Sequence, residues 1–269
     1  MQRSLIQLVP RSMRSFLAVP LLSILAVCSS CFAAEDDPNH LTIFAASSLT
    51  NAFEELVRTY EEQYPDTDVQ LTFAGSQILR FQIEQGASTD LFASANETHM
   101  QALVDADLMG TPRTLGITDL AVIVPQQNPA QIERFDDLDQ ASSIVVGTVY
   151  VPIGAYTERV LELASAELGD AFVNKVRDRV VSRESNVRLV RAKVELGEAD
   201  AALVYRTDAT ASKRVRLVPI PEKFNVQARF PIAMTTETTS AGAATRFLDY
   251  IASPEARGIL ESHGFVTES

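Results

Sequence analysis

The sequence has few of the residues that build metal clusters or disulfide networks. Among its 269 residues are two cysteines, Cys28 and Cys31, three histidines and no tryptophan. A zinc cluster of Cys and His ligands is excluded, because these residues are too few and too scattered. Gly and Pro number only 11 and 12, and 46% of the residues are hydrophobic. This composition excludes a collagen-like or disordered chain and predicts one large or two smaller domains with substantial cores.

Basic residues are also scarce relative to acidic ones. Lys and Arg number 23 and Asp and Glu number 35, which gives a net charge of −12. Such a charge repels the phosphate backbone of nucleic acids and the surface of anionic membranes. We therefore expect no nucleic-acid partner.

The N-terminal segment has the pattern of an export signal. Arg3, Arg11 and Arg14 precede the apolar run 16–27 and no acidic residue accompanies them. That run is too short to span a membrane comfortably, but it is typical of the hydrophobic part of a secretory signal peptide. We therefore expect an exported, periplasmic protein.

Small residues mark the expected cleavage site of this signal. Ala33 and Ala34 are followed at once by an acidic segment, so residues 1–33 are predicted to form the signal peptide. A membrane-anchored lipoprotein is the alternative, with Cys28 as the lipidated residue. It is less favoured, because Val27 is bulky for the position before such a cysteine.

Strand-like and helix-like segments alternate after this signal. Short apolar runs predict strands, and runs with apolar residues on one helical face predict helices. The predicted strands are 41–45, 69–73, 90–95, 120–124, 144–147, 201–205, 215–220 and 230–235. Helices are predicted after Ser48, after Ser76, around Met100, and over 156–168, 170–178, 187–196, 242–252 and 254–262. The alternation predicts βαβ units and a parallel sheet covered by helices.

The fold class is therefore α/β, and the length suits two lobes, each a central sheet flanked by helices. The predicted connections between the lobes are strands near 115–120 and 231–235. Lobe I would comprise residues 35–117 plus 235–269, and lobe II residues 118–234. A ligand cleft is expected between them.

Four junctions between a loop and a helix share one chemistry. At each, several backbone N–H groups lack a partner inside the helix, and the helix dipole adds about half a positive charge. In open α/β sheets such junctions lie at the ends of strands, where ligands bind. If they converge, they form a cluster of neutral donors for an oxyanion. The junctions are Ser47-Ser48, Gly75-Ser76, Pro152-Ile153-Gly154 and Ser185-Asn186-Val187.

Taken singly, each junction has a simpler explanation. A serine before a helix commonly caps it and stabilises it by about 1 kcal/mol. Tyr205, at the end of a predicted strand, fits a half-buried core residue with its hydroxyl in water. The order of these residues along the chain is more informative than any one of them.

That order resembles the periplasmic molybdate-binding proteins of ABC transporters. The similarity covers nearly all of residues 41–266, and the ordered set is specific although each motif alone is weak. The segments that carry it are AASSLTNA (45–52), FAGS (73–76), QIE (82–84), GA (86–87), DLFASA (90–95), VPIGAY (151–156), NVR (186–188), VY (204–205), DA (208–209), Tyr250 and GF (264–265).

The resemblance implies a periplasmic-binding-protein fold of type II and a set of ligand-binding residues. The oxyanion would be held by the hydroxyl and N–H groups of Ser48 and Ser76, the N–H groups of Ile153 and Val187, and the Tyr205 hydroxyl. These residues would hold molybdate or tungstate without any direct bond to the metal, and no cofactor is implied. The implied partners are a membrane permease and its ATPase, with this chain as a monomer.

Two residues depart from the pattern of that family. Ile153 stands where the family usually has Ala, so three more carbons lie near the cavity while the backbone donor is kept. Asn186 stands where Asp is frequent, which we interpret as a variation in the helix cap with little effect on the ligand.

The donor-only set also predicts selectivity. Molybdate, tungstate and sulfate carry no proton near neutral pH, whereas monohydrogen phosphate presents a donor that would find no acceptor. An unpaired buried polar group costs about 1–3 kcal/mol, or about 10–100-fold in affinity. Since only cavity size separates sulfate from molybdate, a sulfate-type oxyanion-binding protein remains an alternative.

A secreted serine hydrolase is an alternative from another class. Ser48 or Ser76 would be the nucleophile and would need a nearby base, but neither lies in a G-x-S-x-G motif. The histidines are His40, His99 and His263, and the first two are expected at the surface. A sensor or scaffold with the same fold is a further alternative, although nothing in the sequence attaches the chain to DNA or to a signalling helix. We expect a binding protein and no catalytic residues.

Overall fold

A computed structural model of the chain describes residues 39–267. The predicted signal peptide and its alternative lipidation site, Cys28, lie outside the described residues. Within these, no helix is both long enough and apolar enough to cross a membrane.

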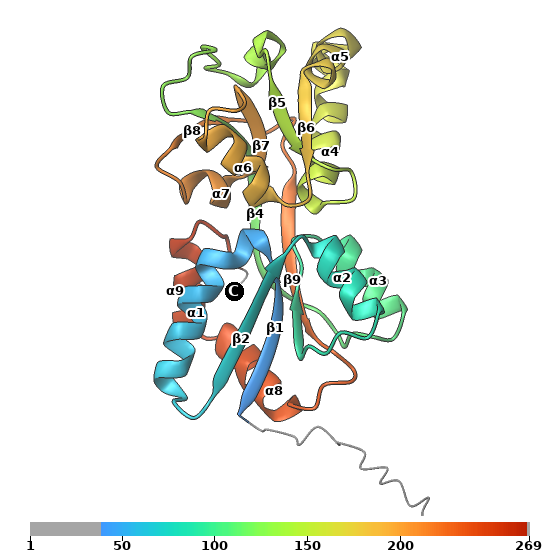
Figure 1. Cartoon of the computed structure of the whole chain (residues 1–269), viewed down its shortest axis with the longest axis vertical. Helices are drawn as coiled ribbons and strands as arrows, with labels where there is room; N and C mark the ends of the chain where they lie inside the picture. The colour runs from blue at the N-terminus through green and yellow to red at the C-terminus, as the bar shows by residue number, and fades with distance from the viewer. Residues whose placement is uncertain (1–38, 268–269) are drawn as a thin grey trace, which may run out of the picture. The chain divides into compact units, whose positions relative to one another are not determined.

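The described strands form one continuous set of hydrogen-bonded neighbours (Figure 1). Their order is β2-β1-β3-β9-β4-β7-β5-β6, and β8 pairs with β4 outside this path. The strands are β1 (His40–Ala46), β2 (Asp68–Ala74), β3 (Leu91–Ala93), β4 (Arg113–Pro125), β5 (Ile144–Gly147), β6 (Val180–Glu184), β7 (Ala201–Tyr205), β8 (Val215–Pro219) and β9 (Gln227–Met234).

The long strand β4 belongs to two half-sheets. Its first part, from Arg113 to Asp119, pairs antiparallel with β9, which in turn pairs with β3. Its second part, from Leu120 to Pro125, pairs with β7 and β8. The chain thus passes from the β1–β3 half-sheet to the β5–β8 half-sheet through β4 and returns through β9. These strands overlap the two predicted connections.

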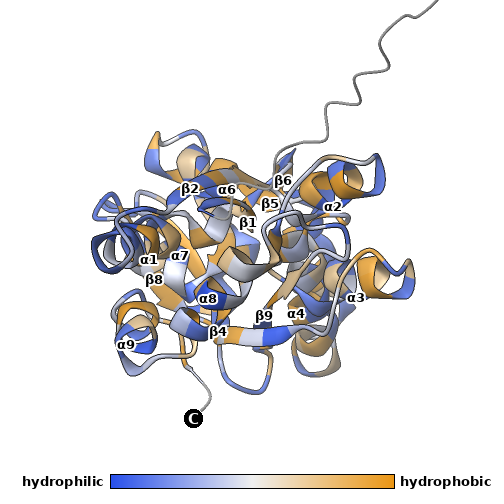
Figure 2. Ribbon diagram, turned by 90° about the horizontal axis from the view of Figure 1, so that it is seen from below, coloured by the Kyte–Doolittle hydropathy of each residue, from blue (hydrophilic) through white to orange (hydrophobic). Residues whose placement is uncertain are grey.

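Helices flank both half-sheets. They are α1 (Thr50–Gln63), α2 (Ser76–Glu84), α3 (Glu97–Asp105), α4 (Pro152–Leu168), α5 (Asp170–Asp178), α6 (Val187–Glu195), α7 (Arg206–Thr210), α8 (Ala241–Ile251) and α9 (Pro254–Ser262). Two short 3-10 helices, η1 (Ser47–Leu49) and η2 (Phe135–Gln140), complete the described elements. Figure 2 shows α1 and α9 on one side of the strands and α2 and α3 on the other.

The helix pattern follows the apolar spacing. Helix α1 buries one face that includes Phe53, Leu56 and Tyr60, and Phe247 of α8 stacks edge-on to Tyr60 with ring centroids 5.0 Å apart. Helix α4 starts at Pro152, whose ring suits the first helical turn, and ends before Gly169 at φ +81°. These packed faces hold the starts of the helices at fixed places beside the strand ends.

The sheet differs from the predicted parallel sheet because it is mixed. The βαβ segments do give parallel pairs between β1 and β2, β1 and β3, β5 and β6, and β5 and β7. Strands β4, β8 and β9 run antiparallel to their neighbours, because the chain reverses direction where it passes between the half-sheets. The sequence analysis also missed β6, an edge strand with exposed residues, and the short helix α7.

Candidate functional site

The five residues singled out from the sequence line a single pocket. All of them, Ser48, Ser76, Ile153, Val187 and Tyr205, line this one small, partly open pocket. They come from segments far apart in the chain, and the pocket joins the two half-sheets.

Each residue is placed by a junction between a strand and a helix. Ser48 lies in η1, directly after β1, and Ser76 is the first residue of α2, after β2. From the other half-sheet, Ile153 is the second residue of α4 and Val187 the first residue of α6. Tyr205 is the last residue of β7. The backbone N–H groups in these first helical turns have no carbonyl one turn earlier in the helix to bond.

The hydroxyl groups in the pocket differ in how they are satisfied. Ser48 Oγ and Tyr205 OH are buried without a hydrogen-bond partner. Ser76 Oγ accepts a hydrogen bond from the Ala95 N–H at 3.0 Å, which fixes the oxygen and leaves its own proton free to be donated. Unpartnered buried hydroxyls are costly in a folded protein, so two side chains here are poised for a partner that the protein itself does not supply.

The capping explanation for the serines is wrong. The N-cap of α2 is Gly75 and that of η1 is Ala46, and neither helix start has a side-chain cap. Asn186 does cap its helix, since its Oδ1 accepts the Leu189 N–H at 3.0 Å, in line with our interpretation of that position.

The side chain of Ile153 packs at least partly against β5. The side chain is fully buried and belongs to the main hydrophobic core. A Cβ on Gly147 would lie only 2.8 Å from Ile153 Cγ2, so the missing side chain of Gly147 makes room for the isoleucine. Ile153 thus lines the pocket while its Cγ2 methyl group packs beside Gly147 of β5.

The pocket is electrically neutral along its lining. None of the described residues that line it carries a charged side chain. Burial raises the pKa of Tyr205 well above its ordinary value of 10, and nearby Tyr156 and Asp208 act in the same direction. The Tyr205 hydroxyl therefore keeps its proton and remains a donor at every physiological pH.

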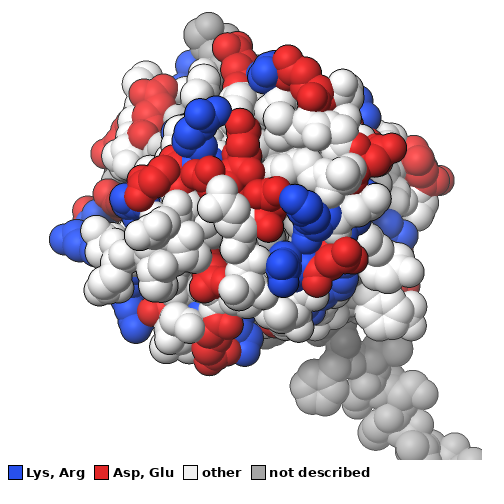
Figure 3. Space-filling view, turned by 90° about the horizontal axis from the view of Figure 1, so that it is seen from above, with Lys and Arg blue, Asp and Glu red and all other residues white. Residues whose placement is uncertain are grey.

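The two arginines near the junctions are engaged elsewhere. Arg80 pairs with Glu84 at 2.7 Å on the surface of α2, and Arg188 donates to Asn51 Oδ1 at 2.8 Å. On the face seen in Figure 3, acidic and basic side chains are interspersed. Any selectivity in this pocket must arise from dipoles and hydroxyls and not from ion pairs.

Three hydrogen bonds around the pocket join the elements of the β1–β3 half-sheet to those of the β5–β8 half-sheet. Besides the Arg188–Asn51 bond between α6 and α1, Gln77 Nε2 donates to the Ser185 carbonyl at 2.8 Å. His99 Nε2 lies 3.0 Å from the Tyr150 carbonyl oxygen. The sequence analysis did not predict these contacts, because each joins residues more than 50 positions apart with no local pattern.

None of the three described histidines hydrogen-bonds to Ser48 or Ser76; the expectation that His99 lies at the surface is wrong, since it is 9% exposed and contacts the Tyr150 carbonyl oxygen. His40 lies 3.1 Å from Asp68 Oδ2 and His263 lies 2.7 Å from Glu55 Oε2. Ser48 Oγ has no partner and Ser76 Oγ bonds to a backbone N–H. Residues 39–267 also contain no group of three or more His, Cys, Asp or Glu side chains that could hold a metal ion.

Comparison with known proteins identifies the family. The family model described as bacterial extracellular solute-binding protein matches residues 41–266. The chain belongs to this family.

Curated members of this extracellular solute-binding family are similar over most of their length. A Bacillus subtilis protein, YvgL, named as a substrate-binding lipoprotein of an ABC transporter, is 33% identical over 93% of this chain and 96% of its own. The molybdate-binding protein ModA of Mycobacterium tuberculosis is 32% identical over 84% of each chain.

Solved structures of such binding proteins have the same fold. The periplasmic molybdate-binding protein of Azotobacter vinelandii gives a TM-score of 0.73 at 20% identity, over 85% of this chain and all of that one. The sulfate-binding protein SubI of Mycobacterium tuberculosis gives 0.74 at 19% identity, over 84% and 86% of the two chains. The expectation of a periplasmic-binding-protein fold is confirmed.

We expect replacement of Ser48 and replacement of Ser76 by alanine to have different effects on the stability of this solute-binding protein. In Ser48→Ala the lost oxygen has no partner, so the ligand-free protein should be as stable as the wild type or slightly more so. In Ser76→Ala the Ala95 N–H loses its acceptor, which should cost about 1–3 kcal/mol. Both should weaken oxyanion binding by about tenfold, since one hydrogen bond to a charged ligand is lost. Urea unfolding and calorimetric titration would measure both effects, and equal unfolding midpoints for the two variants would contradict the assigned bonds.

Proposed function

We propose that this chain captures molybdate or tungstate outside the cytoplasm and delivers the oxyanion to an ABC transporter. The observation that carries the proposal is the shared pocket of Ser48, Ser76, Ile153, Val187 and Tyr205, with two buried hydroxyls lacking a partner. A tetrahedral dianion would accept hydrogen bonds from these neutral donors on all sides. Capture is reversible, no covalent bond is made or broken, and no cofactor takes part.

The relatives favour molybdate over sulfate as the natural ligand. The curated relative named for molybdate binding is 32% identical, whereas the solved structure named for sulfate binding is 19% identical. At 19% identity the likeness concerns the fold alone. Sulfate remains the alternative ligand, since it too is an unprotonated tetrahedral dianion.

Capture would involve closure of two lobes. We assign residues 35–117 plus 235–269 to lobe I and residues 118–234 to lobe II, with β4 and β9 as the connection between them. The hydrogen bonds of Gln77 with Ser185 and of Arg188 with Asn51 then join lobe to lobe. The structure would represent the closed form, which a docking permease distinguishes from the open form.

The proposed partners follow from the family. A membrane permease and its ATPase would receive the anion, and this chain would act as a monomer. Export would depend on residues 1–33, and lipidation at Cys28 is the alternative, which gains support from the relative named as a lipoprotein. Cell fractionation, with metabolic labelling by a fatty acid and a Cys28→Ala variant, separates these two arrangements.

A thermal-shift panel tests the function. Molybdate, tungstate, sulfate and phosphate are added separately to the purified protein. A ligand at 100 times its dissociation constant adds about 2.7 kcal/mol of stability, which for a domain of this size raises the midpoint by about 5–10 °C. We expect that shift with molybdate and tungstate and none with phosphate. A shift with sulfate and none with molybdate would replace the proposal with the sulfate alternative.

A further inference from the structure

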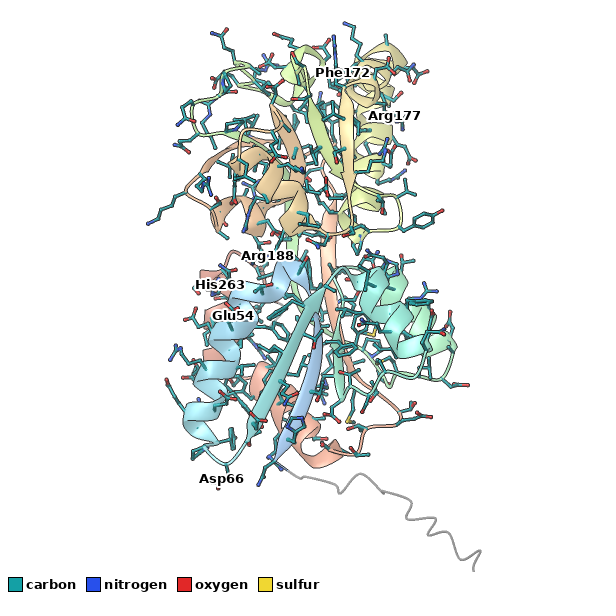
Figure 4. The ribbon with its side chains drawn as sticks, in the orientation of Figure 1. Glu54, Asp66, Phe172, Arg177, Arg188 and His263 are labelled. Atoms are coloured by element: carbon teal, nitrogen blue, oxygen red, sulfur yellow. The ribbon has the colours of Figure 1, made fainter. Side chains whose placement is uncertain are left out.

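A second polar pocket adjoins the anion pocket. It shares Ser48 with the first pocket. Asn51 and His263 line it from the α1 and α9 side, and Arg188 and Asp208 line it from α6 and α7. Figure 4 shows Arg188 and His263 near the boundary between the two half-sheets and their helices. Closure of the lobes would therefore form both pockets together.

The second pocket contains polar atoms that the protein leaves unsatisfied. Asp208 is 3% exposed and Thr207 is 5% exposed, and Asp208 Oδ2 and Thr207 Oγ1 have no hydrogen-bond partner. A buried carboxylate oxygen without a donor is unfavourable when ionised, because the charge has lost its water. Adding a proton removes that cost.

The cation nearest to Asp208 neutralises it only in part. Arg191 Nη1 lies 3.7 Å from Asp208 Oδ1 and donates instead to the Asp208 carbonyl oxygen at 3.1 Å. The same guanidinium also approaches a second carboxylate, with its Nε 3.0 Å from Glu195 Oε1. Arg191 is thus shared between two acidic side chains and does not form a close pair with Asp208.

Burial of Asp208 is therefore the dominant influence on its charge. Burial raises the pKa of Asp208 to about 7, against the opposing effect of Arg191 and Arg188, while Glu195 adds to the rise. The other ionisable groups close to it are Tyr205 of β7, described above, and His263, which pairs with Glu55 of α1. Asp208 would thus be only partly ionised near neutral pH.

We propose that Asp208 is a proton-binding site coupled to oxyanion capture, so that the chain takes up a proton there when the anion binds and the lobes close. The inference rests on the proposed function. Asp208 lies in α7, whose N-cap is Tyr205, and it shares its pocket with Ser48. A bound dianion beside these residues repels the carboxylate charge, and closure removes water from it. Both effects favour the protonated carboxyl group.

The direction of the pH dependence follows from linkage. Because the loaded form binds more protons than the free form, affinity is greatest at low pH and weakens as pH rises. The pKa of about 7 belongs to Asp208 in the closed arrangement, and the open form, in which water reaches this carboxyl group, loses the proton at lower pH. The weakening therefore extends through pH 7. For one linked proton the limit is tenfold in dissociation constant per pH unit, so we expect about three- to tenfold weaker binding at pH 8 than at pH 6. Molybdate itself stays a dianion over this interval.

Calorimetric titration with sodium molybdate tests the coupling. At pH 7.5 the wild type is titrated in buffers of low and high ionisation enthalpy, and the slope of observed heat against buffer enthalpy gives the protons taken up. We expect a fraction of one proton, up to a full proton, for the wild type. For Asp208→Asn, which mimics the protonated carboxyl group, we expect no uptake and a dissociation constant that is the same at pH 6 and pH 8.

Two further variants separate Asp208 from other sources of a proton. Asp139→Asn removes one negative charge at η2, where Asp139 pairs with Lys175, and should keep the proton uptake. His263→Gln should keep it too. Uptake that persists in Asp208→Asn or vanishes in His263→Gln would overturn the inference, as would normal wild-type binding with heat independent of the buffer. Those results leave the proposed function intact, whereas no binding of molybdate by the wild type would overturn both.

Discussion

Tyr205→Phe should bind molybdate about 100-fold more weakly than the wild type while unfolding at a higher temperature without ligand. The Tyr205 side chain is 1% exposed and its hydroxyl has no partner in the protein. Removing that hydroxyl relieves an unsatisfied buried group, which is worth about 1 kcal/mol or more. It also deletes a hydrogen bond to a charged ligand, worth about 3 kcal/mol in a fully buried site. Calorimetric titration and thermal unfolding of the same samples measure the two effects.

The neighbouring tyrosine is the matched control. Tyr156 packs edge-on to Tyr205 with ring centroids 6.2 Å apart, does not line the anion pocket, and hydrogen-bonds to the backbone of Arg229. Tyr156→Phe should therefore lower stability by about 1 kcal/mol and leave affinity nearly unchanged. If Tyr205→Phe also lowered stability and left affinity nearly unchanged, the Tyr205 hydroxyl would be an ordinary structural group and not one of the proposed ligand-binding groups.

The strand–helix junctions could be predicted because local rules determine them. A short apolar run such as Ile144–Gly147 forms a strand in a buried sheet, and Pro152, five residues after that strand ends, suits the start of a helix. Parallel βαβ units place such helix starts beside the strand ends. Hence the residues of the candidate site could be chosen before their positions in space were known, although the resemblance to a family was needed to select them among all possible caps.

The remaining features depend on contacts between distant residues. The mixed sheet arises where β4 pairs with β9, more than 100 positions away, and no periodicity in either strand encodes that partner. Strand β6 alternates only weakly and lies at an edge, so its composition resembles that of a loop. Asp208 is likewise buried because α7 packs against α6, β4, β7 and β8, and no pattern in the sequence indicates this burial.

Gly154→Ala should give the largest loss of stability among the substitutions considered, together with weaker anion binding. A Cβ at this position would lie 1.9 Å from the Thr148 carbonyl oxygen and 2.7 Å from that of Gly147. Both are backbone atoms, so relief requires the start of α4 or the loop before it to move. We expect a loss of about 3 kcal/mol or more. The same movement displaces the Ile153 N–H, the adjacent donor in the pocket, and should weaken molybdate binding by at least about tenfold.

Gly258→Ala is the control for this substitution. Gly258 also lies within a helix, α9, but a Cβ there would meet nothing within 4 Å. Alanine is favoured over glycine inside a helix by about 1 kcal/mol, so this variant should unfold at higher urea concentration than the wild type and bind molybdate normally. A loss of stability in Gly154→Ala together with a gain in Gly258→Ala would show that the close approach at Gly154, and not helix propensity, governs the effect. If Gly154→Ala were as stable as Gly258→Ala and bound the anion equally well, the tight packing at the start of α4 would have no part in holding the pocket.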